Sequence, residues 1–178
     1  MSFDYEHLIV DIPDYPQPGV VFKDITPLIA SPEGFQAVVS QLVEHFSAAG
    51  ATKVMGAEAR GFMVAAPVAY ALHAGFVPAR KPGKLPRKTL TENYALEYGN
   101  DALEIHTDAL TPDDKVIIVD DLIATGGTAL AQLRLIEQAG AQCIGMGFLM
   151  ELAFLHPRDL LQEHRALDIF SLVQVNAS

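Results

Sequence analysis

The hydrophobic pattern of the chain is clearest in the segment that follows Ser31. Apolar residues there recur at the three- and four-residue spacing of one helix face, and they are Phe35, Val38, Val39, Leu42, Val43 and Phe46. Ser31 suits the N-cap, Pro32 suits the first helical position, and Gly50 is a stop signal. The pattern therefore predicts a helix between Ser31 and Gly50 with one buried face.

Short apolar runs alternate with helical patterns along the rest of the chain. They predict strands at residues 53–57, 76–79, 115–121, 142–151 and 167–175. Helices are predicted at residues 4–10, 62–73, 128–140 and 156–161. Strands that alternate with helices form a parallel sheet. The predicted fold class is therefore α/β, an open, mostly parallel, twisted sheet with helices on both faces.

The segment 12–27 does not fit this alternation. It contains four prolines, so we expect an irregular loop, which forms part of a small N-terminal hood over residues 1–30. Its apolar residues Val20, Val21 and Phe22 have two interpretations. They anchor the loop to the core, or Phe22 presents its ring face to a planar ligand.

A second unusual segment spans residues 81–100. It is mostly polar and long for a connection in a compact domain, which is typical of a functional lid. Alternating residues at 94–98 and 103–106 predict a β-hairpin in this region. We therefore expect a hairpin lid that opens and closes.

The most informative stretch runs from Val116 to Thr128. Four β-branched residues predict a buried parallel strand, and Asp120 and Asp121 follow where that strand ends. A small-residue loop then leads into a helix, so backbone N–H groups converge on one point and favour an anion. The loop consists of Ala124, Thr125, Gly126, Gly127 and Thr128. Two carboxylates beside such a loop suit a ligand with hydroxyls next to its phosphate, such as a ribose phosphate.

Two other phosphate-binding motifs do not match. A Walker loop needs a lysine directly after its second glycine, but Thr128 follows Gly127. The segment Gly145-Met146-Gly147 begins like a dinucleotide fingerprint, but Met150 stands where the third glycine belongs. The alternative to a phosphate loop is an ordinary strand–turn–helix with a polar turn.

Length and charge limit the possible functions further. The chain has 178 residues and half are hydrophobic, which predicts one folded domain over residues 1–178. A net charge of −10 disfavours nucleic-acid binding, which depends on phosphate neutralisation. Five of the twelve Lys and Arg residues lie in residues 80–88. This cluster is either a solvated basic loop or part of a polyphosphate site.

The remaining features concern location. No apolar run approaches the roughly 18 residues of a membrane span, so no membrane partner is expected. The acidic N-terminal residues lack a signal-peptide pattern. The single Cys143 lies in an apolar run and is expected to be a buried strand residue. Together these features lead us to expect a cytoplasmic protein.

The stretch 120–128 resembles the phosphoribosyl pyrophosphate signature of type I phosphoribosyltransferases. Further segments resemble the adenine branch of that family, so that the resemblance covers nearly the whole chain: 18–28, 58–62, 80–86, 96–99 and 103–106. The resemblance implies an enzyme that converts adenine and phosphoribosyl pyrophosphate into AMP and pyrophosphate. It also implies a homodimer and a Mg²⁺ ion bound with the phosphoribosyl pyrophosphate.

The resemblance implies roles for the polar residues. Asp120 and Asp121 face the ribose hydroxyls, and the loop 124–128 holds the 5′-phosphate. The pyrophosphate contacts are implied to come from Arg60, Lys84 and Arg80, with Arg80 reaching the site of the neighbouring subunit. For Arg60, a salt bridge to Glu58 is the alternative. Mg²⁺ is expected to be held mainly by ligand oxygens and water, near the two aspartates.

The base pocket and the lid follow from the same resemblance. The implied adenine pocket consists of Val21, Phe22, Lys23 and Leu155, with Phe22 stacked on the purine. Glu97 and Tyr98 lie on the lid, where Glu97 is the implied acid/base group. Tyr98 is carried over with it from the Leu-Glu-Tyr-Gly motif.

The sequence departs from the family pattern at two places. Lys23 stands where the family commonly has Arg, which matters at a planar site but not for main-chain contacts. The segment 156–158 reads His-Pro-Arg where a Gly-Arg pair is more usual. Two rival functions stay open. One is a phosphoribosyltransferase for hypoxanthine, guanine or xanthine, and the other is a regulator that binds the ligand without turnover.

Overall fold

The computed structural model describes residues 3–95 and 100–176. The strands are β1 (Val10–Pro13), β2 (Val21–Asp24), β3 (Lys53–Ala57), β4 (Gly75–Ala79), β5 (Thr89–Ala95), β6 (Asn100–His106), β7 (Lys115–Ile123), β8 (Gln142–Leu152) and β9 (Ile169–Val175). The helices are α1 (Thr26–Ala30), α2 (Pro32–Phe46), α3 (Arg60–Ala71), α4 (Gly127–Gln138) and α5 (Pro157–His164), with 3₁₀ turns η1 (Glu6–Leu8) and η2 (Ala153–Leu155).

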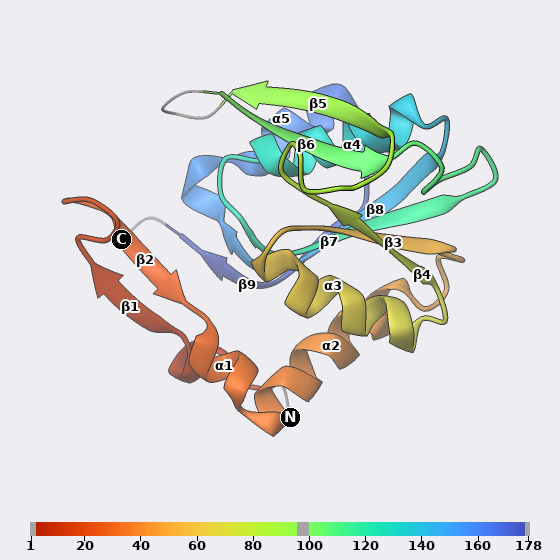
Figure 1. Cartoon of the computed structure of the whole chain (residues 1–178). Helices are drawn as coiled ribbons and strands as arrows, with labels where there is room; N and C mark the ends of the chain where they lie inside the picture. The colour runs from red at the N-terminus through yellow and green to blue at the C-terminus, as the bar shows by residue number, and fades with distance from the viewer. Residues whose placement is uncertain (1–2, 96–99, 177–178) are drawn as a thin grey trace.

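Five strands form one parallel sheet in the order β4-β3-β7-β8-β9 (Figure 1). Strand β7 is central, and residues 116–119 are completely buried. A central strand covered on both faces needs apolar side chains on both, which explains its continuous β-branched run. Cys143 is buried in the neighbouring β8, as predicted.

The helices cover both faces of this sheet (Figure 1). On one face α2 and α3 pack through residues such as Leu42 and Val64. On the other face α4 and α5 pack through residues such as Leu133 and Leu161. The predicted α/β class, with an open parallel sheet between two helical layers, is therefore confirmed.

Helix α2 follows its sequence pattern closely. The Ser31 hydroxyl accepts a hydrogen bond from the Gly34 amide at 3.1 Å, which caps the helix N-terminus. The helix ends at Phe46, four residues before the predicted stop at Gly50. The Phe46 ring lies against β8, where a Cβ at Gly145 would be 2.7 Å from the ring. The absence of a side chain at that glycine therefore lets the helix approach the sheet.

Two predictions for the N-terminal region were wrong. The expected helix at residues 4–10 is only the short turn η1, and residues 12–27 are not irregular. Strands β1 and β2 form an antiparallel hairpin, and α1 follows directly. The prolines fit because Pro13 ends its strand while Pro16 and Pro18 lie in the connecting turn.

The predicted second hairpin is present but begins earlier. Strand β5 starts at Thr89, and it pairs antiparallel with β6 across seven residue pairs. The inner residues Leu103 and Ile105 of β6 are buried in the core. Strand β5 lies on α4, where Glu92 accepts hydrogen bonds from Arg134 at 3.3 Å and Gln138 at 2.6 Å. The base of the hairpin is thus anchored to the domain.

Most other elements match their predicted positions within a few residues. The largest extension is in α5, which runs to His164 rather than ending near residue 161. In the part of the chain that the structure describes, no helix is long and apolar enough to cross a membrane.

One buried side chain is poorly matched to its surroundings. Gln132 in α4 is fully buried, and neither amide atom has a hydrogen-bond partner among the described residues.

Gln132→Met keeps the length of the side chain and removes the unpaired polar atoms. We expect the free energy of unfolding to rise by roughly 1–3 kcal/mol, measured by urea denaturation.

Gln36→Met is the matched control, because Gln36 is exposed on α2. Its free energy of unfolding should change by less than about 0.5 kcal/mol. A Gln132→Met variant no more stable than this control would show that the buried amide is satisfied in solution.

Candidate functional site

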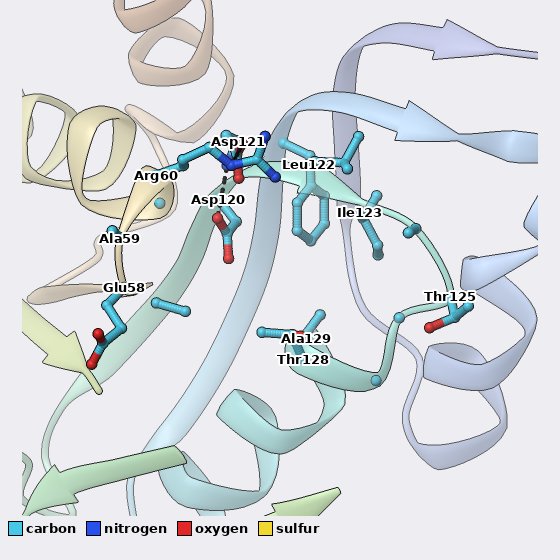
Figure 2. Close-up of a pocket in the computed structure, with 16 residues that line it drawn as sticks. Glu58, Ala59, Arg60, Asp120, Asp121, Leu122, Ile123, Thr125, Thr128 and Ala129 are labelled. Atoms are coloured by element: carbon cyan, nitrogen blue, oxygen red, sulfur yellow. Dashed lines mark hydrogen bonds and ion pairs between the residues drawn. The ribbon is translucent and has the colours of Figure 1, made fainter. Parts of the chain in front are cut away.

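A cavity of about 250 Å³ opens at the carboxyl ends of β3 and β7. Strand β4 lies on one side of β3, while β8 and β9 lie beyond β7 on the other, so the strand order reverses between β3 and β7. Open parallel sheets bind ligands at this point, because the loops after the two strands diverge to opposite faces. The cavity is lined by Ala57–Gly61, Asp120–Ala129 and Phe148 (Figure 2).

The loop after β7 is shaped to receive an anion. Gly126 has φ of +92° and forms the N-cap of α4 without a side-chain hydrogen bond to the helix amides. Positive φ favours glycine, and the uncapped amides leave donors directed at the cavity. Thr125 and Thr128 add hydroxyl groups to the lining (Figure 2). All five residues of the predicted loop 124–128 therefore line the same cavity.

Asp120 is 8 % exposed, and its Oδ1 accepts a hydrogen bond from the Asp121 amide at 2.9 Å. Burial, followed by the adjacent Asp121 carboxylate, raises the pKa of Asp120 well above its ordinary value. The carboxylate is also pressed against Gly61, where a Cβ would lie 2.5 Å from Oδ1. Glycine at position 61 therefore makes room for Asp120.

Asp121 is 5 % exposed and lies beside Arg60 at the start of α3. Arg60 Nε is 3.1 Å from Asp121 Oδ2, an ion-pair distance (Figure 2). The alignment does not make a hydrogen bond, and Oδ2 has no other partner among the described residues. Arg60 thus pairs with Asp121 rather than with Glu58, the alternative considered from the sequence.

Glu58 has a different role. Its Oε1 accepts hydrogen bonds from Arg80 Nε at 3.2 Å and from the Lys81 amide at 2.7 Å. Arg80 Nη1 also donates to the Lys84 carbonyl at 3.4 Å. These contacts hold the basic segment at the edge of the cavity, but Arg80 and Lys84 do not line it.

The predicted base-pocket residues divide into two groups. Arg60 Cζ lies 5.2 Å from the centre of the Phe22 ring. Phe22 therefore contacts a residue that lines the cavity of about 250 Å³. The Lys23 side chain instead points to Asp11, with Nζ 2.6 Å from Oδ1. It lines a separate cavity of about 360 Å³ between the N-terminal hairpin and the ends of β8 and β9. Val21 is about half exposed.

Two further predictions concern residues at the rim. Leu155 is 40 % exposed at the end of η2 and does not line the cavity of about 250 Å³. Glu97 and Tyr98 lie outside the described residues, so their positions stay predictions.

Sequence reasoning missed some residues that matter here. The contact between Gly61 and Asp120 joins residues far apart in the chain, and its only signal was a glycine after Arg60 in a strand-to-helix turn. Phe148 also lines the cavity, although it reads as an ordinary residue of β8. Such contacts depend on the sheet order, which no local pattern gives.

The residues that line the cavity can bind several kinds of chemical group. The loop amides and hydroxyls can hold a phosphate, the two carboxylates can accept hydrogen bonds from hydroxyls, and Arg60 can meet a second anionic group. No group of three or more His, Cys, Asp or Glu side chains able to hold a metal occurs within residues 3–95 and 100–176. A cation here would therefore need ligand oxygens or water besides Asp120 and Asp121.

Comparison with known proteins agrees with this geometry. Residues 28–173 match the family described as phosphoribosyl transferase domain. The adenine phosphoribosyltransferase of Acidothermus cellulolyticus is 60 % identical over 153 residues, which cover 86 % of each chain. The crystal structure of the enzyme of that name from Thermoanaerobacter pseudethanolicus has a TM-score of 0.92 at 44 % identity, covering 96 % of this chain and 98 % of the other.

A second similar structure contains bound ligands. It is adenine phosphoribosyltransferase from Saccharomyces cerevisiae, complexed with an imino-altritol bisphosphate and adenine. Its TM-score is 0.86 at 37 % identity, and the match covers 94 % of this chain and 96 % of that one. With these identities over most of its length, the chain belongs to the adenine phosphoribosyltransferase family.

Proposed function

We infer that this protein transfers the 5-phosphoribosyl group of phosphoribosyl pyrophosphate to adenine, giving AMP and pyrophosphate, a reaction of purine salvage. The observation that carries the inference is the meeting of Asp120, Asp121, Arg60 and the loop 124–128 around one cavity. A phosphate loop alone fits many ligands. A buried pair of carboxylates next to it specifies a ligand with hydroxyls beside its phosphate.

The phosphate and the ribose of the substrate would each meet a different part of the cavity lining. We assign the 5′-phosphate to the amides and hydroxyls of residues 124–128, at the N-terminus of α4. The ribose hydroxyls would donate to Asp120 and Asp121, whose charges also favour positive charge developing at the anomeric carbon. Attack by the base nitrogen breaks the bond from that carbon to pyrophosphate, so this stabilisation grows toward the transition state.

The leaving pyrophosphate requires cations. Arg60 lines the cavity, and its guanidinium would exchange Asp121 for a pyrophosphate oxygen. Lys84 lies in the basic segment beside the cavity, and Arg80 is assigned to the site of a second subunit in a homodimer. In the single chain, Arg80 is held by Glu58. In such a dimer, Arg60 and Lys84 of one subunit and Arg80 of the other would surround the same pyrophosphate. An acidic protein would thereby concentrate its few cations at the site.

Adenine would lie between the N-terminal hairpin and the turn η2. Phe22 would stack on the purine, and its position beside Arg60, which lines the cavity, supports this assignment. Val21 and the Lys23 main chain would form the edge of the pocket, while Leu155 would cover the other face. Because the Lys23 side chain pairs with Asp11, its replacement of the usual Arg leaves main-chain recognition possible.

Magnesium fits the same site. The two buried carboxylates stand side by side, and Asp121 Oδ2 lacks a hydrogen-bond partner among the described residues. Asp120 and Asp121 would hold the ion together with oxygens of the substrate and water. When bound, Mg²⁺ supplies positive charge that neutralises the pyrophosphate.

Water must be kept from the reacting sugar, because hydrolysis competes with transfer to the base. The β5–β6 hairpin is placed for this: Ala95 O is 3.5 Å from the point where a Cβ on Gly127 would lie. We assign Glu97 and Tyr98, which follow Ala95 in the sequence, to the closed site. Glu97 would accept the proton that the base loses on forming its new bond.

The base specificity is tested by supplying the enzyme, Mg²⁺ and phosphoribosyl pyrophosphate with adenine, hypoxanthine, guanine or xanthine in separate reactions. Nucleotide formation should be strongly preferred with adenine, and Phe22→Ala should weaken adenine use. Preference for another base would overturn the base-pocket assignment. Tight ligand binding without turnover of any base would instead indicate a regulator.

The acid/base assignment is tested by Glu97→Gln. We expect turnover to fall by about 10²-fold, within the usual contribution of a positioned acid/base group, with the unfolding temperature unchanged. Glu44→Gln, an exposed position on α2, is the control and should keep full activity. A near-normal rate in Glu97→Gln would remove Glu97 from the mechanism.

Asp120→Asn should separate stability from activity. The pKa of Asp120 is raised in the folded protein, so ionising it costs stability as pH rises from its ordinary value of about 4. We expect Asp120→Asn to stabilise the fold at pH 7–8 by roughly 0.5–2 kcal/mol, with the gain vanishing toward pH 4. Turnover should fall, because a ribose hydroxyl loses its charged acceptor.

Urea denaturation across this pH range measures the effect. The exposed Asp108 is the control, since its hydrogen bond from Arg87 lowers the pKa of Asp108. Asp108→Asn should therefore give no gain at neutral pH. Loss of stability in Asp120→Asn at pH 8 would mean that the buried charge is compensated in solution.

A further inference from the structure

The carboxyl end of β8 carries another buried carboxylate, Glu151, which the mechanism above does not use. Glu151 is 2 % exposed and does not line the cavity of about 250 Å³. Arg158 donates from Nε to Oε1 at 2.8 Å and from Nη2 to Oε2 at 2.7 Å, and the Ser171 hydroxyl donates to Oε2 at 2.7 Å. Burial would raise the pKa of Glu151, but these hydrogen bonds lower it overall, so the pair is ionic.

Arg158 extends the contact to a third element. Its Nη1 donates to the Ile169 carbonyl at 3.0 Å, so the guanidinium joins α5 to the end of β8 and the start of β9. A planar guanidinium bound in this forked way has its position and orientation fixed. The Glu151–Arg158 pair is thus a rigid joint between the sheet and α5.

Helix α5 in turn supports the phosphate loop. A Cβ at Gly126 would lie 3.2 Å from the Pro157 carbonyl oxygen and 3.5 Å from Leu160 Cδ2. The first turn of α5 therefore packs behind the residue that turns the chain into α4. Among the residues that the structure describes, no side chain caps this turn of α5, since its N-cap residue His156 makes no such hydrogen bond. Arg158, together with the buried Pro157 and Leu161, holds the turn in place.

Between the two partners lies a short segment with an exposed turn. It includes η2, whose large apolar residues Phe154 and Leu155 are 43 % and 40 % exposed. The Glu151–Arg158 pair fixes the chain on both sides of this turn. The pair therefore bounds the segment that carries Leu155 and joins the first turn of α5, which packs behind Gly126, to the sheet.

We propose that the Glu151–Arg158 pair is a positioning lock that holds α5 against the phosphate loop and η2 over the adenine pocket. The proposal rests on the function assigned above. It predicts that loosening the lock weakens both substrates together, although neither residue lines the phosphate-loop cavity. Since bound substrates restore the arrangement, KM should change more than kcat.

The test compares Glu151→Gln and Arg158→Lys with Glu137→Gln. Glu137 also pairs with a residue of α5, His164, at 2.9 Å, but at the far end of the helix. We expect KM for phosphoribosyl pyrophosphate and for adenine to rise about tenfold in the two lock variants, within the effect of a small misplacement. The kcat should stay within about twofold, and Glu137→Gln should resemble the parent protein.

A purely structural role is separated by replacing both partners with leucine. An apolar pair of this kind can restore stability without restoring a directional contact. If Glu151→Leu with Arg158→Leu unfolds at the parent's urea midpoint but keeps the raised KM values, the lock is confirmed. Parent-like KM values in this variant would overturn it.

Unchanged KM values in folded Glu151→Gln and Arg158→Lys would overturn it too. Calorimetric binding of phosphoribosyl pyrophosphate to each variant, without any base, keeps this outcome distinct from a failure of the adenine assignment. Weaker binding in the lock variants would support the lock whichever base the enzyme uses.

Discussion

Two adjacent carboxylates buried at the end of β7 are the constraint on which the site depends. Asp120 and Asp121 are both almost inaccessible, and burial beside another carboxylate raises the pKa of Asp120. Burying two adjacent carboxylates lowers the stability of the fold unless nearby groups make room for them or pair with them. Gly61 gives Asp120 its space, and Arg60 stands beside Asp121. Two consecutive residues at the start of α3 thus serve the two consecutive acids of β7.

This pairing follows from the sheet order. Because β3 and β7 are neighbours and parallel, the turns after them meet at one edge while α3 and α4 leave to opposite faces. The loop 124–128 and the turn 58–61 therefore face one another across the acids. The loop 124–128 is local in sequence, but the cavity that it lines requires this meeting of two distant segments.

The sequence pattern was a good guide wherever chemistry and structure are local. The strand, the acid pair and the loop before α4 could be predicted because each depends on residues within a few positions. The hairpin of β1 and β2 could not, since prolines masked two short strands whose pairing depends on their turn. The Glu151–Arg158 contact was also missed, because a buried acid and a helix arginine show no signal until β8, β9 and α5 are assembled.

The contacts around Arg60 show how the two halves of the site are joined. Its guanidinium lies over Phe22, in the N-terminal hairpin, and beside Asp121, at the end of the central strand. One side chain therefore connects the N-terminal hairpin to the end of the central strand. Because the Arg60 side chain is 41 % exposed, its guanidinium can change partners without moving the backbone of β2 or β7. The site thus combines a partly exposed arginine with a loop whose turn, at Gly126, is backed by the first turn of α5.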